Sequence, residues 1–322
     1  MTHLPDMTGA TLMEFLFGDA AAEQKKAAIE SVTPAMITGE FLADCAQSLL
    51  ARAMPLQLDG LDVCGTGGDS TRQASKTFNV STAVAFVVAA DGIPVIKHGN
   101  RAVSGTSGSS DVLAALNIPI CTDAVSAAQQ YNAHHLAFVS APAFHPVLKT
   151  LAEVRKSIGR PTFLNLLGPL CNPARTKRQM IGVFGQPYLH PVADAAQRLG
   201  KKSVLVLHSR DGLDEISTAD VTDGMRLANG QLSPVTLSPG DMGMAHSGLE
   251  SISCASPGDS ARMICEIFEN RRAADIIILN AAAAFVVAGR DATFTDGAMR
   301  ANRLIESGQA LQKLHAMQGA AA

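Results

Sequence analysis

The sequence has no tryptophan, few aromatic residues and no long apolar run. Aromatic residues make up 4% and charged residues 17% of its 322 residues, and 47% are hydrophobic. No window reaches the roughly 18 uncharged apolar residues of a membrane-spanning helix. The start, MTHLPDMTGATLMEF, has neither a basic region nor a cleavable apolar stretch. We therefore expect a globular protein of the cytoplasm that has no membrane partner.

An excess of positive charge is also missing. Lys and Arg number 26 against 29 for Asp and Glu, which gives a formal net charge of −3. Such a chain has no global positive field, so we expect no nucleic-acid partner, although a local basic pocket is compatible with this balance. The six cysteines are Cys45, Cys64, Cys121, Cys171, Cys254 and Cys265. They form no C-x-x-C pair, which favours buried reduced thiols over a zinc site or a disulfide set.

The hydrophobic pattern divides the chain into two parts, in line with a length of about two domains. Apolar residues recur at helical spacing over 9–54, with Thr38 as a candidate helix cap. From residue 61 onward, apolar runs (LDVCG, IPVIKHG, KSVLVLH and ADIIILN) alternate with alanine-rich stretches, and we interpret these runs as strands. The expected fold class is α/β, with a small helical domain at 1–58, a later helical contribution from about 145–160, and a larger α/β domain at 59–322 built on a central, mostly parallel sheet.

Two loops have the composition of phosphate sites. GTGGD (65–69) follows a strand-like run and precedes a helix that we expect to begin near Asn79, Ser81 and Thr82. Backbone N–H groups of such a loop, together with a helix start, bind phosphate. The spacing matches neither G-x-G-x-x-G nor G-x-x-x-x-G-K-[ST], so dinucleotide and Walker-type sites find no support. A plain strand-to-helix turn is the alternative interpretation.

The second loop, KHGNRAVSGTSGSSD (97–111), combines cations with small hydrogen-bond donors. Lys97 and Arg101 lie beside His98, Asn100 and several Ser and Gly residues. This composition suits a polyphosphate or a phosphosugar. The alternatives are a solvated Gly/Ser loop and, for His98, a packed structural histidine.

Three further charged residues are candidates for binding a ligand. Asp214 and Glu215 follow the strand-like run that ends at His208, where open α/β sheets bind ligands. Adjacent carboxylates there are suited to Mg²⁺ on a substrate polyphosphate, or they form an acidic surface turn. Arg155 lies on an expected helix and is either a binding residue or a solvated side chain. No motif for a covalent nucleophile or for zinc chemistry is present, so we expect no covalent nucleophile.

In their order and spacing these motifs resemble the anthranilate phosphoribosyltransferase family of tryptophan biosynthesis. The resemblance runs from about residue 61 to the C-terminus. The motifs that carry it are GTGGD (65–69), TFNVST (77–82), KHGNRAVSG (97–105), SGSSD (107–111), HP with VRKSIG (145–159), NLLGPLCNPA (165–174), DGLDE (211–215) and ILNAAAAFVVAG (278–289). It implies a Mg²⁺-dependent transferase, a glycosyltransferase that moves phosphoribose from phosphoribosyl pyrophosphate to anthranilate. It also implies a homodimer paired through the helical domains.

The resemblance assigns roles to residues by their position in these motifs. The phosphoribosyl pyrophosphate site would comprise Gly65, Gly68, Asp69, Thr77, Asn79, Val80, Ser81, Thr82, Lys97, His98, Gly99, Asn100, Arg101, Ala102, Val103, Ser104, Gly105 and Ser109. The anthranilate site would comprise Gly65, Asn100 and Arg155, with His98 along the acceptor path. The Mg²⁺ ligands would be Ser81, Asp214 and Glu215.

The chain departs from the family pattern at two places. The segment STRQASK (70–76) is longer than the family's, and its Arg72 and Lys76 either add phosphate contacts or reshape the acceptor pocket. Pro161 and Thr162 stand where the family has Arg-Thr. Three other functions are compatible with this fold: a phosphoribosyltransferase for a different aromatic acceptor, a pyrimidine nucleoside phosphorylase, and a non-catalytic relative that binds nucleic acid. KHGNR and DGLDE argue against the second, and the net charge and the two carboxylates argue against the third.

Overall fold

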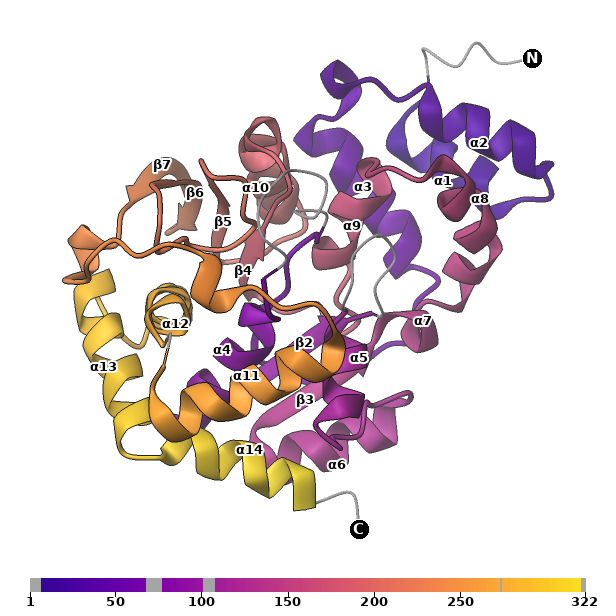
Figure 1. Cartoon of the computed structure of the whole chain (residues 1–322). Helices are drawn as coiled ribbons and strands as arrows, with labels where there is room; N and C mark the ends of the chain where they lie inside the picture. The colour runs from indigo at the N-terminus through magenta and orange to yellow at the C-terminus, as the bar shows by residue number, and fades with distance from the viewer. Residues whose placement is uncertain (1–6, 68–76, 101–107, 273, 320–322) are drawn as a thin grey trace.

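A single mixed sheet forms the centre of the protein. The computed structural model describes residues 7–67, 77–100, 108–272 and 274–319, and Figure 1 shows the arrangement of their elements. The sheet has seven strands in the order β3-β2-β1-β4-β5-β6-β7. The strands are β1 (Leu61–Val63), β2 (Val95–Gly99), β3 (Leu136–Ser140), β4 (Arg178–Gly182), β5 (Ser203–Ser209), β6 (Thr222–Ala228) and β7 (Gln231–Leu237). Strands β1 to β5 are parallel to one another, whereas β6 pairs with both β5 and β7 in antiparallel fashion. The expected α/β class with a mostly parallel sheet is confirmed.

Helices cover both faces of this sheet, because successive strand side chains point to opposite faces. On one face Leu205 and Leu207 of β5 belong to the core that contains α4 (Val80–Ala90) and α12 (Asp275–Ala288). On the other face Val204 and Val206 belong to the core that contains α9 (Phe163–Leu170) and α10 (Leu189–Arg198). The remaining helices on the α4 side are α5 (Ser109–Ala115), α11 (Pro257–Asn270), α13 (Phe294–Glu306) and α14 (Gln309–Gly319). Helix α6 (Ala124–His134) packs through Ala127 into a smaller core with Ile96 of β2 and Ala137 of β3, on the opposite face of these strands.

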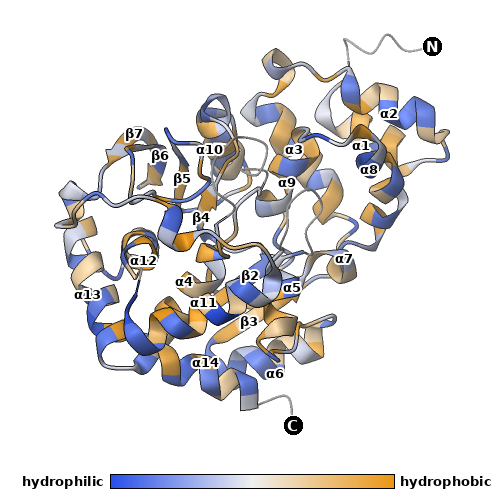
Figure 2. Cartoon of the chain, viewed as in Figure 1, coloured by the Kyte–Doolittle hydropathy of each residue, from blue (hydrophilic) through white to orange (hydrophobic). Residues whose placement is uncertain are grey.

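One of the four expected strands is wrong. The run ADIIILN (274–280) begins α12 and is not a strand. All residues from 276 to 287 are buried, so α12 is apolar around its whole circumference and shows no helical periodicity in the sequence. Figure 2 shows this contrast with α13 and α14, which alternate hydrophobic and hydrophilic positions. The other three runs are confirmed as β1, β2 and β5.

The N-terminal region is helical, as the spacing predicts. It consists of α1 (Gly9–Phe17), α2 (Ala22–Glu30) and α3 (Gly39–Leu50), and the Thr38 hydroxyl caps α3 by accepting the N–H of Phe41 at 3.1 Å. The expected later helical contribution begins as a 3-10 helix, η4 (Pro146–Leu151), and continues as α8 (Ala152–Ile158). These helices share one buried core with α9, α10 and the sheet. The domain boundary between residues 58 and 59 stays a prediction.

The described residues contain no helix that is both long enough and apolar enough to cross a membrane. All six cysteines are free thiols; five are buried, and Cys265 is partly exposed. Because β1 to β5 are parallel, their carboxyl ends lie at the same edge of the sheet. The loops after β1, β2 and β5, which carry the expected site residues, therefore meet there.

Candidate active site

A pocket of about 280 Å³ lies at the carboxyl edge of the sheet, between the sheet and the helices α3, α8 and α9. Loops and element ends from distant parts of the sequence line it. Of the expected site residues, it contains Gly65, Thr77, Asn79, Val80, Ser81, Lys97, His98, Gly99, Asn100, Ser109, Arg155, Asp214 and Glu215. The structure thus brings the donor, acceptor and metal candidates to one cavity.

The structure does not place the other expected site residues in this pocket's described lining. Thr82 is fully buried on α4 and is not among the described residues that line the pocket. Gly68, Asp69, Arg101, Ala102, Val103, Ser104 and Gly105 lie outside the described residues, as does the segment 70–76. The roles expected for them stay predictions.

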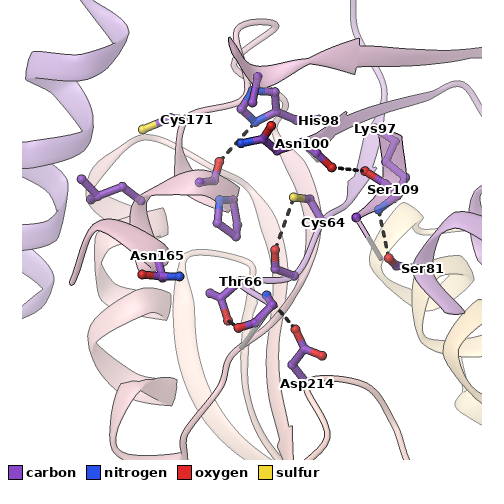
Figure 3. Close-up of a pocket in the computed structure, with 18 of the residues that line it drawn as sticks. Cys64, Thr66, Ser81, Lys97, His98, Asn100, Ser109, Asn165, Cys171 and Asp214 are labelled. Atoms are coloured by element: carbon purple, nitrogen blue, oxygen red, sulfur yellow. Dashed lines mark hydrogen bonds between the residues drawn. The ribbon is translucent and has the colours of Figure 1, made fainter. Parts of the chain in front are cut away.

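Lys97 marks the cationic end of the pocket. It is the third residue of β2, and only 3% of it is exposed. Its ammonium donates to the carbonyl of Val63 at 2.7 Å and to the Ser81 hydroxyl at 3.0 Å, which ties β2 to the end of β1 and to the first turn of α4. Figure 3 shows the contact with Ser81. The charge of this Lys and the positive end of the α4 dipole therefore act on the same part of the pocket.

Asp214 and Glu215 hold the loop after β5 against this cationic end. Asp214 Oδ2 accepts the N–H of Gly67 at 2.9 Å, and Glu215 Oε1 accepts the N–H of Ser81 at 3.2 Å. Gly65 permits this close approach, since a Cβ on it would lie 2.8 Å from Asp214 Oδ2. The loop is thus packed directly onto the glycine-rich segment after β1.

This donor set fits a magnesium ion. Two carboxylates and the Ser81 hydroxyl offer the hard oxygen ligands that Mg²⁺ prefers. Within the described ranges no three His, Cys, Asp or Glu side chains come together, so the protein would supply only part of the coordination sphere. Substrate phosphates and water complete such a sphere in Mg²⁺ sites of this kind.

Arg155 marks the opposite, acceptor end of the pocket. It lies half-buried near the C-terminal end of α8, where Gly159, with φ 65°, ends the helix as the sequence predicts. Burial lowers the pKa of its guanidinium. Its side chain makes no ion pair or hydrogen bond with any residue that the structure describes. Within the described residues, Arg155 is therefore a cation without a counter-charge at this cavity, which favours the binding of an anionic ligand.

Two buried histidines lie side by side in the wall of the pocket. The rings of His98 and His145 meet edge to face, with centroids 5.2 Å apart. His98 Nδ1 lies 3.2 Å from the carbonyl of Gly168, and His145 Nε2 lies 2.7 Å from that of Cys171, so these nitrogens carry the protons. Burial, with a smaller contribution from His145, lowers the pKa of His98 to about 3, and burial also lowers the pKa of His145. Both rings are neutral at pH 7.

A buried carboxylate fixes this wall to the sheet. Asp62 Oδ2 accepts from Asn172 Nδ2 at 2.8 Å and from Gln179 Nε2 at 3.2 Å, and Asp62 Oδ1 accepts the N–H of His98 at 3.4 Å. Gln179 also donates to the carbonyl of Pro169 in α9 at 2.6 Å. Burial raises the pKa of Asp62 to about 6, against the effect of these donors. Strands β1, β2 and β4 and helix α9 are thus joined beneath the pocket.

Sequence reasoning missed most of the acceptor wall. Leu49 from α3, Leu148 from η4, and Leu164 and Asn165 from α9 line the pocket, together with His145. The leucines carry no signal beyond apolar periodicity. Asn165 is the first residue of NLLGPLCNPA, and a polar side chain beside an apolar run is the feature that could have marked it as a site residue. The departure at residue 161 leaves the helix start intact, since Thr162 caps α9 by accepting the N–H of Leu164 at 3.3 Å.

Comparisons with known proteins identify the family. Residues 57–311 match the model of the glycosyl transferase family, a/b domain. An anthranilate phosphoribosyltransferase of Geobacillus sp. is 38% identical over 307 residues, which cover 94% of this chain and 89% of that protein. The enzyme of the same name from Halorhodospira halophila is 44% identical over 256 residues, covering 79% and 74%.

Solved structures show the same fold. The crystal structure of anthranilate phosphoribosyltransferase from Thermus thermophilus matches with a TM-score of 0.88 and 28% identity, covering 97% of this chain and 95% of that one. A Saccharomyces cerevisiae enzyme, solved in complex with PRPP and Mg, matches with a TM-score of 0.81 and 23% identity, covering 98% and 94%. The chain is therefore an enzyme of the glycosyl transferase family. Within it, the chain belongs to the anthranilate phosphoribosyltransferases, which confirms the resemblance seen in the sequence.

Proposed function

We propose that this enzyme transfers the phosphoribosyl group of phosphoribosyl pyrophosphate to the amine of anthranilate in tryptophan biosynthesis, giving N-(5'-phosphoribosyl)anthranilate and pyrophosphate. The observation that carries the proposal is the two-ended pocket. One end combines Lys97, the start of α4 and two carboxylates, and the other combines Arg155 with an aliphatic wall. A donor with a polyphosphate and an acceptor with a carboxylate and an apolar ring fit these ends respectively.

The donor end suits the pyrophosphate and the ribose phosphate. The first turn of α4, Lys97 and the segment after β1 supply N–H groups and a cation. Asp214, Glu215 and the Ser81 hydroxyl are proposed to hold Mg²⁺, which when bound neutralises charge on the pyrophosphate. The Saccharomyces cerevisiae protein, which shares the fold, was solved with PRPP and Mg. The glycine-rich and KHGNR loops are proposed to complete this end through residues outside the described ranges.

The acceptor end suits an aromatic acid. Arg155 would pair with the carboxylate, and Leu49, Leu148 and Leu164 would contact the ring. Related structures of this fold were solved with 4-fluoroanthranilate, which has the same carboxylate and amine. Asn100 and Gly65 are proposed to lie where the two substrates meet, since both line the same pocket as Lys97 and Arg155.

The proposed reaction is a displacement at the anomeric carbon of the ribose. The bond from this carbon to pyrophosphate breaks, the amine nitrogen forms the new bond, and the nitrogen gives up one proton to an oxygen of the released pyrophosphate. Negative charge grows on the leaving pyrophosphate, where Lys97 and backbone N–H groups stabilise it. Arg155 holds the ring so that the weakly basic amine faces the sugar, and this orientation supplies much of the rate. The neutral histidines and leucines exclude water, which would otherwise hydrolyse the donor.

The direct test is the loss of anthranilate fluorescence on mixing with phosphoribosyl pyrophosphate and Mg²⁺, with controls that contain EDTA or lack the donor. Donor-dependent loss that EDTA abolishes supports the reaction. Absence of loss while calorimetry still shows donor binding would refute anthranilate as the acceptor and favour a different aromatic acid. Absence of donor binding would refute the transferase assignment and favour the non-catalytic alternative.

Two expectations beyond the reaction accompany this proposal. The homodimer implied by the resemblance would pair through the helical region, where Phe15 of α1 is 36% exposed. Light scattering after size-exclusion chromatography measures the oligomeric state directly, and a monomer at micromolar concentration would refute the dimer. The location in the cytoplasm stays a prediction.

A further inference from the structure

We propose that Asn165 is an additional binding residue for the acceptor, and that its amide N–H groups donate to the carboxylate that Arg155 pairs. This inference rests on the proposed function, because it takes an aromatic acid as the acceptor. It adds a neutral donor from α9 to the acceptor residues that the sequence motifs indicate, namely Gly65, Asn100 and Arg155, with His98 along the acceptor path. The argument depends on how α9 holds the Asn165 amide.

The start of α9 fixes the orientation of this amide. Asn165 is the third residue of the helix, and its Oδ1 accepts the N–H of Thr162 at 3.0 Å. A backbone N–H can only donate, so the atom that faces it must be the amide oxygen. The hydrogen bond therefore assigns the oxygen to the helix start and leaves the Nδ2 group pointing away from it.

The donor side of the amide has no partner among the described residues. Among the residues that the structure describes, none accepts a hydrogen bond from Asn165 Nδ2, although Asn165 is only partly exposed. Asn165 lines the pocket, and Figure 3 shows it on the opposite side of the pocket from Lys97 and Ser81. Two N–H donors are thus presented at the acceptor end of the cavity.

The surroundings favour an anion at this place. Arg155 lines the same cavity from α8, and the neighbouring wall is formed by Leu49, Leu148 and Leu164. Among the described residues the two carboxylates that line the pocket are Asp214 and Glu215, which lie on the loop after β5 and hydrogen-bond to the donor-side segments. A carboxylate has two oxygens with about four acceptor positions, so it can take Arg155 and Asn165 together.

The chemistry of the acceptor decides which of its groups Asn165 contacts. An N–H donor bound to the aryl amine would occupy the lone pair that attacks the sugar. A donor bound to the carboxylate leaves that lone pair available and adds a second point of attachment, which fixes the orientation of the ring. Asn165 is therefore expected to contribute to the choice of an acid over a neutral analogue, since a site built of donors disfavours a group that itself donates.

The test uses Asn165→Asp, which separates binding from helix capping. An Asp at this position keeps the oxygen that accepts from Thr162, so α9 keeps its cap. It removes both donors and adds a negative charge next to the acceptor carboxylate. Thr162→Ala is the matched control, because it removes the hydroxyl that accepts from Leu164 and leaves Asn165 in place. Initial rates are measured over both substrates, with 2-aminobenzamide as the neutral analogue of anthranilate.

For Asn165→Asp we expect the KM for anthranilate to rise on the order of tenfold to a hundredfold, as for a hydrogen bond to a charged group. The KM for phosphoribosyl pyrophosphate should change by less than about twofold, and the preference for anthranilate over 2-aminobenzamide should fall at least about tenfold. Thr162→Ala should lower the melting temperature and leave both the KM values and the preference unchanged.

Three outcomes decide the matter. An unchanged preference in Asn165→Asp, or equal losses for both substrates, would overturn the role of Asn165 and leave it as a helix-capping residue. If Asn165→Asp does not fold, Asn165→Ser replaces it, and an unchanged preference there has the same meaning. If the wild-type enzyme does not consume anthranilate, the proposed function is refuted. If the wild-type enzyme consumes anthranilate but Asn165→Asp leaves the KM and the preference unchanged, only the role of Asn165 is refuted.

Discussion

Removing the guanidinium of Arg155 tests the acceptor end of the pocket most directly. The side chain is half-buried, and burial lowers its pKa, so it acts on a ligand in a poorly hydrated environment. A charge-assisted hydrogen bond contributes about 1.5 to 3 kcal/mol. At about 1.4 kcal/mol per factor of ten, Arg155→Gln should therefore raise the KM for anthranilate by roughly 10- to 150-fold.

Neither stability nor the affinity for phosphoribosyl pyrophosphate should depend on Arg155. Because Arg155 makes no ion pair with a described residue, its removal leaves no described carboxylate without a partner. The free energy of unfolding should therefore stay within about 0.5 kcal/mol. The KM for phosphoribosyl pyrophosphate should change by less than about twofold, since the donor end lies at Lys97. Arg155→Lys should give an intermediate KM, because an ammonium keeps the charge but loses the planar fork.

The assay is the initial rate of anthranilate fluorescence loss at varied concentrations of each substrate. Lys156→Gln is the matched control, since it removes an exposed cation from the next position of α8. Equal increases in both KM values would refute the assignment of Arg155 to the acceptor. An equal effect in the Lys156 control would show that the net charge of α8, and not a specific contact, is responsible.

Three other perturbations test the rest of the site. Replacing Asp214 and Glu215 by Asn and Gln should abolish turnover and the dependence of donor affinity on Mg²⁺, and calorimetry that still shows Mg²⁺-dependent binding would exclude them as ligands. The pKa of His98, lowered from 6.5 to about 3, means that the unfolded chain binds more protons between these values, so folding stability falls as the pH drops below about 6.5. His98→Gln should therefore reduce the acid loss of stability by about 1 kcal/mol per pH unit between pH 6 and 5 in urea denaturation, and parallel curves would contradict this. A Cβ on Gly182 would collide with the backbone carbonyl of Asp214, so Gly182→Ala should displace the loop after β5. We expect this substitution to lower the free energy of unfolding by at least about 1 kcal/mol and to weaken Mg²⁺ binding. Gly240→Ala is the control and should change neither, because the nearest atom to a Cβ there is 3.8 Å away.

The donor end of the pocket could be predicted because its residues are close together in the sequence. The segments around Gly65, Asn79 and Lys97 each join a strand end to a loop or a helix start, and such local patterns keep their geometry in any α/β sheet. The pairing of these segments with Asp214 also follows from topology, since all of them leave parallel strands at the same edge.

The acceptor end could not be predicted in the same way. Leu49 comes from α3 and Leu148 from η4, and they reach the pocket only through the core that joins the helical region to the sheet. Their apolar character is equally compatible with any buried face. The wrong strand at 274–280 has a related cause, because complete burial removes the periodicity that separates a helix from a strand. The last residue of that run, Asn280, accepts from the backbone N–H of Ile216 and donates to its carbonyl, which is a contact between distant segments.

The hydrogen bonds of Asp62 hold the two ends of the pocket at a fixed distance from each other. Its carboxylate holds the backbone of His98, and Gln179, which donates to it, also holds Pro169 of α9. A shift of α9 against β2 would therefore break bonds to a fully buried carboxylate, which is among the costliest changes in a protein interior. The raised pKa of Asp62 shows that burial of this charge destabilises its ionised form. The buried carboxylate of Asp62 thus lies where α9 joins β2, the strand that bears Lys97. By holding these two elements together, Asp62 is expected to set the separation between the proposed acceptor and donor sites.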